Sequence, residues 1–183
     1  MPVRRTVFFL ALLIAAGCSR SAPAAADAGA QQLHFPALTG RVVDQAGLLP
    51  PAQVGAVAAI SADIERRTKA QYVVVTLKSL EGDTIEDYGV RLGRTWGIGR
   101  KGVNDGLLLI VAPAERKVRI EVGYGLERRI TDPYAKKVID QTIMPAFKRG
   151  DFADGIREGS LALERRLLSR QSDAEIYQED HRS

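Results

Sequence analysis

The chain has 183 residues, a length typical of one domain with a substantial core, and its 45% hydrophobic and 26% charged content is that of a globular protein. The net charge is +4, and without Arg4 and Arg5, which lie in a segment expected to be removed, 24 basic residues stand against 22 acidic ones. So small an excess, with no basic stripe, argues against nucleic acid as a partner.

Residues 1–18 are predicted to be a lipoprotein-type signal peptide. Two arginines precede an apolar run of about ten residues, which is too short for a comfortable transmembrane helix. Small residues then precede Cys18, the only cysteine, as in the lipobox of bacterial lipoproteins, although Ala15 stands where leucine is usual. Lipidated Cys18 would anchor the exported protein at the periplasmic face of the envelope, and Ser19 favours the outer membrane over the inner. Ordinary signal cleavage with an incidental cysteine is the alternative.

Three further segments complete the predicted organisation. Residues 19–32 are rich in Ala, Ser and Gly without apolar periodicity, which is typical of a flexible tether. The folded domain is expected to span 33–170. The polar tail, 171–183, is predicted to be disordered.

The domain is predicted to begin with a helix over 50–68, which starts at a proline pair and has apolar residues at helical spacing. Residues 71–77 are apolar on both faces, as expected of a central strand. A second helix follows Thr84, which can cap it, and ends before Gly97.

Residues 107–122 are predicted to form a β-hairpin. The stretch 107–111 is a continuous apolar run, and 117–122 alternates with period two after the turn-rich residues 113–116. Because a hairpin returns its second strand to the start of the first, we expect Asp105 to lie close to the loop 123–125.

Two more helices complete the pattern. Asp132 and Pro133 suit the N-cap and first position of a helix that Pro145 interrupts, and a last helix follows Asp151. The expected fold is α/β, a single three-layer α/β/α sandwich with a small mixed sheet that includes the hairpin. A right-handed crossover would make the two apolar strands parallel neighbours, with Asp105 at their N-terminal edge.

Several kinds of chemistry are absent from the sequence. The two histidines, His34 and His181, stand at the start of the domain and in the tail, so nucleophilic catalysis by Ser–His or Cys–His pairs is not expected. Residues 97–102 match Gly-x-Gly-x-x-Gly, but they follow a helix and precede a strand, the reverse of a dinucleotide site. No dinucleotide is therefore expected.

The strongest candidate site is the acidic rim, which we define as Asp105, Glu127 and Asp132. Their carboxylates and neighbouring backbone carbonyls suit a hard divalent cation, Ca²⁺ above others. Tyr124 is a candidate for stacking on a ligand. The glycines expected in this ligand-binding loop are Gly106, Gly123 and Gly125.

The alternative interpretation is that the same residues have purely structural roles and bind no ligand. Asp132 is accounted for as a helix cap, Asp105 as part of a turn, and Glu127 as an ion-pair partner of a nearby arginine. Tyr124 would then pack over the hairpin, and the glycines would adopt torsions that other residues avoid. The sequence leaves these alternatives open.

An ordered series of motifs resembles one family along almost the whole domain, from about Phe35 to Leu168. The series comprises Val43–Gly47, Gln71–Val75, Trp96–Gly99, Asn104–Leu109, Arg116–Glu127, Thr131–Asp132, Ile143–Phe147, Gly150–Phe152 and Gly155–Ile156. Together they resemble the TPM domain, whose members include exported bacterial proteins, a thylakoid-lumen phosphatase-like protein and photosystem II repair factors. The resemblance implies a compact α/β/α sandwich.

The resemblance implies two functions. The favoured one is a membrane-tethered accessory of the cell envelope that binds a divalent cation and unidentified envelope proteins. The alternative is a weak, metal-assisted acid phosphatase acting on phosphomonoesters, in which Asp105 is the catalytic residue that binds metal or activates water. Asp44 is a further candidate ligand because it lies in a family motif. A purely structural rim without ligand is the third interpretation.

Overall fold

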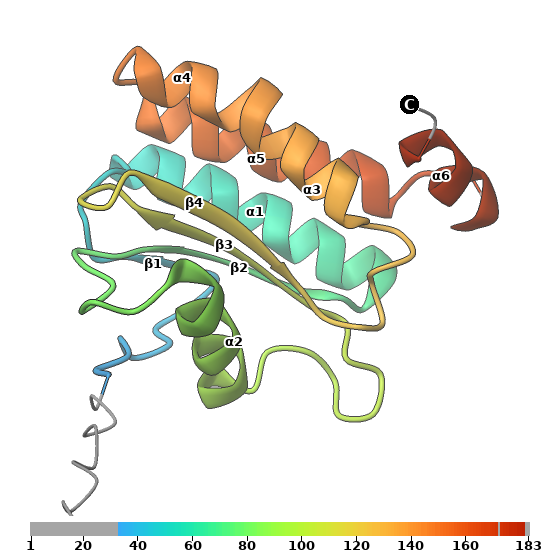
Figure 1. Ribbon diagram of the computed structural model, residues 1–183, viewed down its shortest axis with the longest axis horizontal. Coiled ribbons are helices and arrows are strands. Elements are labelled where there is room, and N and C mark those ends of the chain that lie inside the picture. The colour runs from blue at the N-terminus through green and yellow to red at the C-terminus, as the bar shows by residue number, and fades with distance from the viewer. Residues whose placement is uncertain (1–32, 172, 182–183) are drawn as a thin grey trace, which may run out of the picture. The chain divides into compact units, whose positions relative to one another are not determined.

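The computed structural model describes residues 33–171 and 173–181, so the predicted signal peptide with Cys18 and the tether 19–32 lie outside the described residues. The sheet has four strands in the order β1-β2-β3-β4 (Figure 1). Their bounds are β1 Val42–Asp44, β2 Gln71–Thr76, β3 Gly106–Ala112 and β4 Lys117–Val122. The first three strands are parallel, and β3 and β4 form the antiparallel hairpin. The predicted mixed sheet is confirmed, but β1 was not foreseen.

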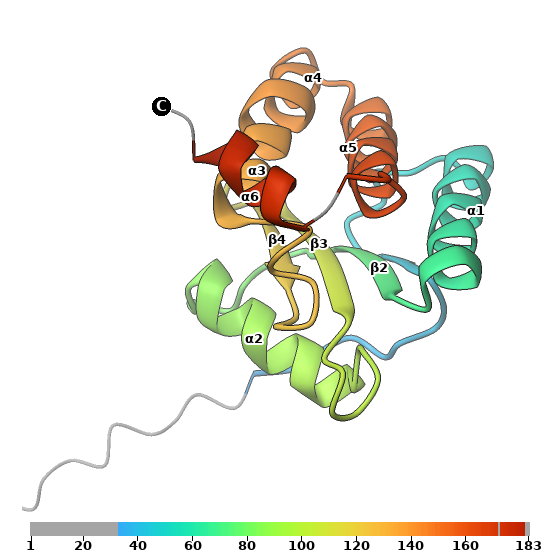
Figure 2. The same cartoon turned by 90° about the vertical axis from the view of Figure 1, so that its right-hand side faces the viewer.

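Helices cover both faces of the sheet, which confirms the three-layer sandwich (Figure 2). One face carries α2 (Ile85–Trp96), and the other carries α1 (Pro51–Thr68) and α5 (Phe152–Leu167). On the α5 side, α3 (Asp132–Val138), a π-helix η1 (Ile139–Ile143) and α4 (Met144–Lys148) run in succession. Within the described residues no helix combines the length and apolarity needed to cross a bilayer.

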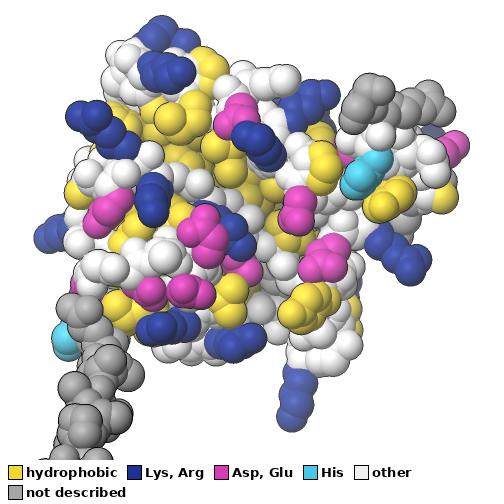
Figure 3. Space-filling view, viewed as in Figure 1, with side chains coloured by type: hydrophobic (Ala, Val, Ile, Leu, Met, Phe, Trp, Pro, Cys, Tyr) yellow, Lys and Arg dark blue, Asp and Glu magenta, His cyan; other side chains and the backbone are white. Residues whose placement is uncertain are grey.

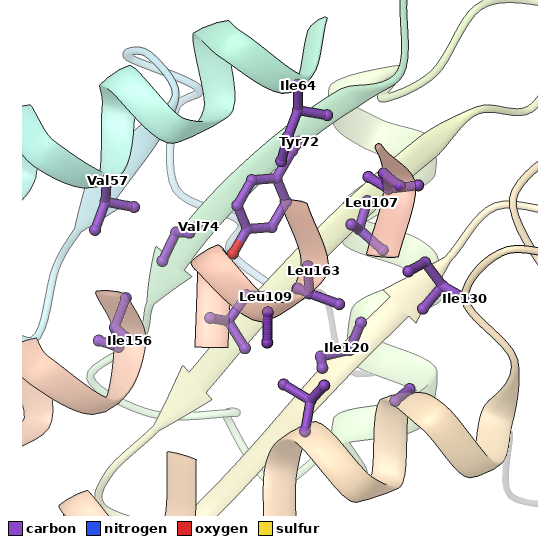
Figure 4. Packing of buried hydrophobic residues seen from close by; sticks show 14 of the residues in the cluster. Val57, Ile64, Tyr72, Val74, Leu107, Leu109, Ile120, Ile130, Ile156 and Leu163 are labelled. Carbon is purple, nitrogen blue, oxygen red and sulfur yellow. The ribbon is translucent and has the colours of Figure 1, made fainter. Parts of the chain in front are cut away.

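The alternating side chains of β2 and β3 build two cores. Tyr72 and Leu109 face α1 and α5 (Figure 4). Val73 and Ile110 belong to the other core, which faces α2. The Tyr72 hydroxyl is fully buried and meets Ser160 Oγ at 2.8 Å. Burial raises the pKa of Tyr72 far above its ordinary value, so the hydroxyl stays protonated as a structural hydrogen-bonding group.

Helix starts follow the expected chemistry with one correction. Thr84 accepts a hydrogen bond from the Asp87 N–H and caps α2 as predicted. The cap of α3 is Thr131, whose hydroxyl accepts from the Tyr134 N–H, and Asp132 is the first helical residue. The prediction of Asp132 as N-cap was wrong by one residue. Threonine and aspartate both favour the N-terminal end of a helix, so the sequence did not separate Thr131 from Asp132.

The predicted interruption lies just before Pro145 and is a change of helix type, with no break in the helical path. Pro145 has no N–H for the helical ladder, and the turn that leads to it, η1, is a π-helix between α3 and α4. The chain therefore stays helical through the proline.

The tail is not disordered throughout, which corrects the prediction for residues 171–183. Residues Asp173–Asp180 form α6, whose Ile176 is fully buried. Asp180 pairs with the buried Arg166 guanidinium and accepts a hydrogen bond from the Thr131 hydroxyl. One buried apolar side chain and the carboxylates of Glu179 and Asp180, which both pair with Arg166, attach this helix. So few residues do not stand out in a polar segment.

Candidate functional site

Asp105 lies just before β3 and is held by the loop that precedes it. Its Oδ1 accepts the Arg100 backbone N–H at 2.7 Å, and its Oδ2 accepts Arg100 Nε at 2.7 Å and Nη2 at 2.5 Å. The turn that brings Arg100 back includes two residues with positive φ, Gly102 at 79° and Asn104 at 57°. The Asp105 side chain is only 5% exposed, so both of its oxygens are committed to Arg100.

This pairing sets the charge state of Asp105. Burial alone would raise the pKa of the carboxyl, but the hydrogen bonds and charge of Arg100 outweigh burial and hold the pKa below its usual range. Asp105 is therefore an ionised, hydrogen-bonded group at neutral pH. Such a carboxylate stabilises the loop and is a weak proton acceptor.

The glycines after β4 are required by close backbone approach. A Cβ on Gly123 would lie 2.2 Å from the Asn104 carbonyl oxygen, and one on Gly125 would lie 2.1 Å from that of Val103. Neither glycine has a positive φ, so the expectation of unusual torsions was wrong. Side chains here would push the loop 123–125 off the loop before β3.

A groove of about 1020 Å³ follows the outer side of β4 between α2 and the α3–η1 segment; we call it the β4 groove. Figure 3 looks onto this side and shows apolar side chains gathered among charged ones. The lining from α2 includes Glu86, Val90 and Arg94, that from β4 includes Val118, Ile120 and Val122, and that from α3–η1 includes Asp132, Lys136 and Asp140. Acidic and basic side chains both line the groove, so it has no single charge sign.

The structure brings only part of the predicted site into this groove. Glu127 and Asp132 are exposed and line its end beside Gly123, and Tyr124, which is 77% exposed, lies there too. Gly106 also lines the groove. One structural alternative expected Tyr124 to pack over the hairpin; its exposed ring does not do so.

Asp44 lies elsewhere. It ends β1 at the edge of the sheet opposite to Asp105, because β1 pairs with the last residues of β2 whereas β3 begins beside the first. Its oxygens accept the N–H groups of Leu48 and Leu49 and the Thr76 hydroxyl. The structure thus gives this motif residue a turn-stabilising role and does not bring it to the acidic rim.

The donor set for a cation is therefore smaller than the sequence indicated. Across residues 33–171 and 173–181, no three acidic, histidine or cysteine side chains gather in a way that could hold a metal ion. Glu127 and Asp132 are the two predicted ligands that reach the groove and whose carboxylates form no ion pair within residues 33–171 and 173–181. Two such carboxylates suit an open site that binds a hard, largely hydrated cation weakly, and they are too few for a closed coordination cage.

Two features of the site were missed from sequence. The pairing of Arg100 with Asp105 was not predicted, although a basic residue five positions before an acid, across a glycine-containing turn, is a signal for a local ion pair. The free edge of β4 was also missed, because neighbours in a sheet depend on strand order. Alternation in 117–122 indicated a half-buried strand but could not indicate that it is an edge.

Comparison with known proteins agrees with this architecture. Residues 42–166 match the family model of the TPM domain. The N-terminal domain of a protein from P. gingivalis, solved by solution NMR, is 37% identical, with a TM-score of 0.66 over 70% of this chain and 82% of that chain. No curated protein matches the chain.

Two more distant structures share the fold. The N-terminal domain of the cg2496 protein from Corynebacterium glutamicum is 18% identical over 76% of this chain and 87% of its own, with a TM-score of 0.57. The BA42 protein from the psychrophilic bacterium Bizionia argentinensis is 19% identical over 65% of this chain and 81% of its own, also with a TM-score of 0.57. Both likenesses concern the fold alone.

Proposed function

Because the chain belongs to the TPM domain family, we propose that it is a binding accessory of the bacterial cell envelope, attached to the membrane through lipidated Cys18, that assists assembly or maintenance of protein complexes. The observation that carries this proposal is the β4 groove, a surface recess lined by both apolar and charged side chains. Such a recess suits recognition of another polypeptide.

A divalent cation, Ca²⁺ above others, is part of the proposal. Glu127 and Asp132 would hold it at the end of the groove beside Tyr124, in an open site completed by water. There the cation would supply positive charge to a surface that two acids otherwise make negative. Asp105 takes no part in this site because its oxygens hold Arg100.

The ion pair between Asp105 and Arg100 also favours a binding role over a hydrolytic one. A metal-assisted phosphatase needs a carboxylate that is free to bind metal or to accept a proton from water. Asp105 is 5% exposed, hydrogen-bonded through both oxygens and held at a lowered pKa, so it supplies neither readily. No other observation favours the phosphatase.

The test is a Ca²⁺ titration by calorimetry of the purified protein, beside hydrolysis of p-nitrophenyl phosphate with Ca²⁺, Mg²⁺ or EDTA. We expect weak Ca²⁺ binding that is lost when Glu127→Gln and Asp132→Asn are combined. It should persist in Glu86→Gln, a matched change of a carboxylate at the groove's other end. Metal-dependent turnover that disappears in Asp105→Asn, with folding intact, would refute the binding role in favour of the phosphatase.

A further inference from the structure

The outer edge of β4 presents a row of backbone groups that no strand of the described residues 33–171 and 173–181 pairs with. The Gly123 N–H donates to the Gly106 carbonyl at 2.8 Å, which fixes the phase of the antiparallel ladder. In that phase Arg119 and Glu121 bond to β3, whereas the N–H and C=O groups of Val118, Ile120 and Val122 point away from it. These three residues are among those that line the β4 groove.

Side chains on the two faces of β4 define what could lie beside it. Val118, Ile120 and Val122 face the core under α1 and α5. Arg119 and Glu121 lie on the other face, beneath α2, and pair with each other at 2.6 Å. An added strand would therefore meet apolar neighbours on one face and a positive and a negative neighbour on the other.

The position of α2 decides how much protein can approach this edge. A Cβ on Gly89 of α2 would lie 3.3 Å from Glu121 Oε2 and 3.6 Å from Arg119 Cδ, so α2 lies directly over β4. Figure 2 shows α2 on one side of the β4 edge and α3 on the other. The edge is thus recessed between two helices.

A second copy of the chain does not fit this recess. Pairing two β4 strands about a two-fold axis would place both α2 helices on the same face of the sheet, over strands about 4.8 Å apart. Packed helix axes need about 8–10 Å. One extended segment without a covering helix has no such conflict.

We propose that the β4 groove binds an extended segment of a partner protein, with alternating apolar and charged residues, as an added fifth strand beside β4. The backbone of the segment would satisfy the outward groups of Val118, Ile120 and Val122, which gives affinity. An acidic residue opposite Arg119 and a basic residue opposite Glu121 would give register. This inference specifies the partner-binding part of the proposed function and rests on it.

The sequence of β4 itself supplies a probe. In antiparallel register, a capped peptide Lys-Val-Arg-Ile-Glu-Val places its Glu opposite Arg119 and its Arg opposite Glu121. The control peptide has the same residues in the order Lys-Arg-Glu-Val-Ile-Val, which removes the alternation. Amide hydrogen exchange of the purified protein, followed by NMR, reports the result residue by residue.

We expect the probe to slow exchange of the Val118, Ile120 and Val122 amides and the control peptide to leave them unchanged. Two variants sharpen the test. Val118→Pro removes one outward N–H without removing a bond to β3, and Val118→Ala trims the side chain but keeps the N–H. Val118→Pro should bind the probe at least about fivefold more weakly than Val118→Ala, since one backbone hydrogen bond is lost.

Equal slowing by both peptides, equal affinity of the two variants, or slow exchange of these amides caused by dimers of the chain alone would overturn the inference. If Val118→Pro does not fold, the exchange pattern of the unmodified protein decides. Ca²⁺ binding that persists without peptide binding would refute this inference alone, whereas metal-dependent turnover would refute the proposed function.

Discussion

Replacing Asp105 by asparagine tests whether this residue stabilises a loop or performs chemistry. The change keeps size and shape but removes the charge, so the side chain offers at best a neutral acceptor and an amide N–H₂ to the Arg100 guanidinium. A hydrogen bond to a charged group contributes about 1.5–3 kcal/mol, and the lower part of this range applies because the Arg100 side chain is 49% exposed. We expect Asp105→Asn to lower the free energy of unfolding by about 2 kcal/mol at neutral pH.

The pH dependence provides a second, independent expectation. The pKa of Asp105 is lower in the folded protein than in the unfolded chain, so its contribution is complete above the unfolded pKa of about 3.9. The contribution is lost as the pH falls through the folded value. The difference between the unmodified protein and Asp105→Asn should therefore shrink steadily as the pH is lowered from about 5 towards 2.

Urea unfolding followed by circular dichroism measures both effects. The control is Glu127→Gln, which changes an exposed carboxylate of the same rim that forms no ion pair within the described part of the chain. It should change the free energy of unfolding by less than about 0.5 kcal/mol. A cost for Asp105→Asn as small as that of the control, or one independent of pH, would refute the reasoning that the Arg100 pair determines the role of Asp105.

Three other changes test backbone packing and ion pairing elsewhere in the domain. Gly125→Ala should destabilise the protein by about 3 kcal/mol in urea unfolding, because the new Cβ would lie 2.1 Å from the Val103 carbonyl oxygen; a neutral result would contradict the close approach. Gly55→Ala, in the second turn of α1 with nothing within 4 Å of the new Cβ, should instead stabilise the protein by about 0.5–1 kcal/mol in the same assay. Asp180→Ala leaves the buried Arg166 without its closest carboxylate and should cost about 3 kcal/mol, with faster amide exchange throughout α6; unchanged exchange would mean that α6 docks without this pair.

Local patterns predicted the centre of the fold. The apolar run of β3 and the alternation of β4 are short-range signals, and the turn between them fixes their pairing. The short strand β1 gave no such signal, because three residues form it and it depends on pairing with β2, more than 25 residues away. Helix α6 was missed for a related reason, since Ile176 and Asp180 acquire meaning only through distant partners.

The candidate site was predictable in place but not in chemistry. Hairpin geometry correctly placed Asp105 beside the glycine loop, and Glu127 and Asp132 do line one groove. What Asp105 does there depends on the turn that returns Arg100 to it, and the sequence does not show that both oxygens are used. For Asp44 the position itself was not predictable, because membership in a family motif carries no information about which edge of the sheet the residue occupies.

The position of α2 over β4 also bears on how the folded protein avoids self-association. An edge strand with Val118, Ile120 and Val122 on one face is a template on which misfolded chains can polymerise into fibrils. The overhanging α2 keeps a folded copy away from this edge, because the incoming copy brings its own helix into the same space. Edge-to-edge growth of folded copies through β4 is therefore blocked, while a single extended segment can still reach the edge.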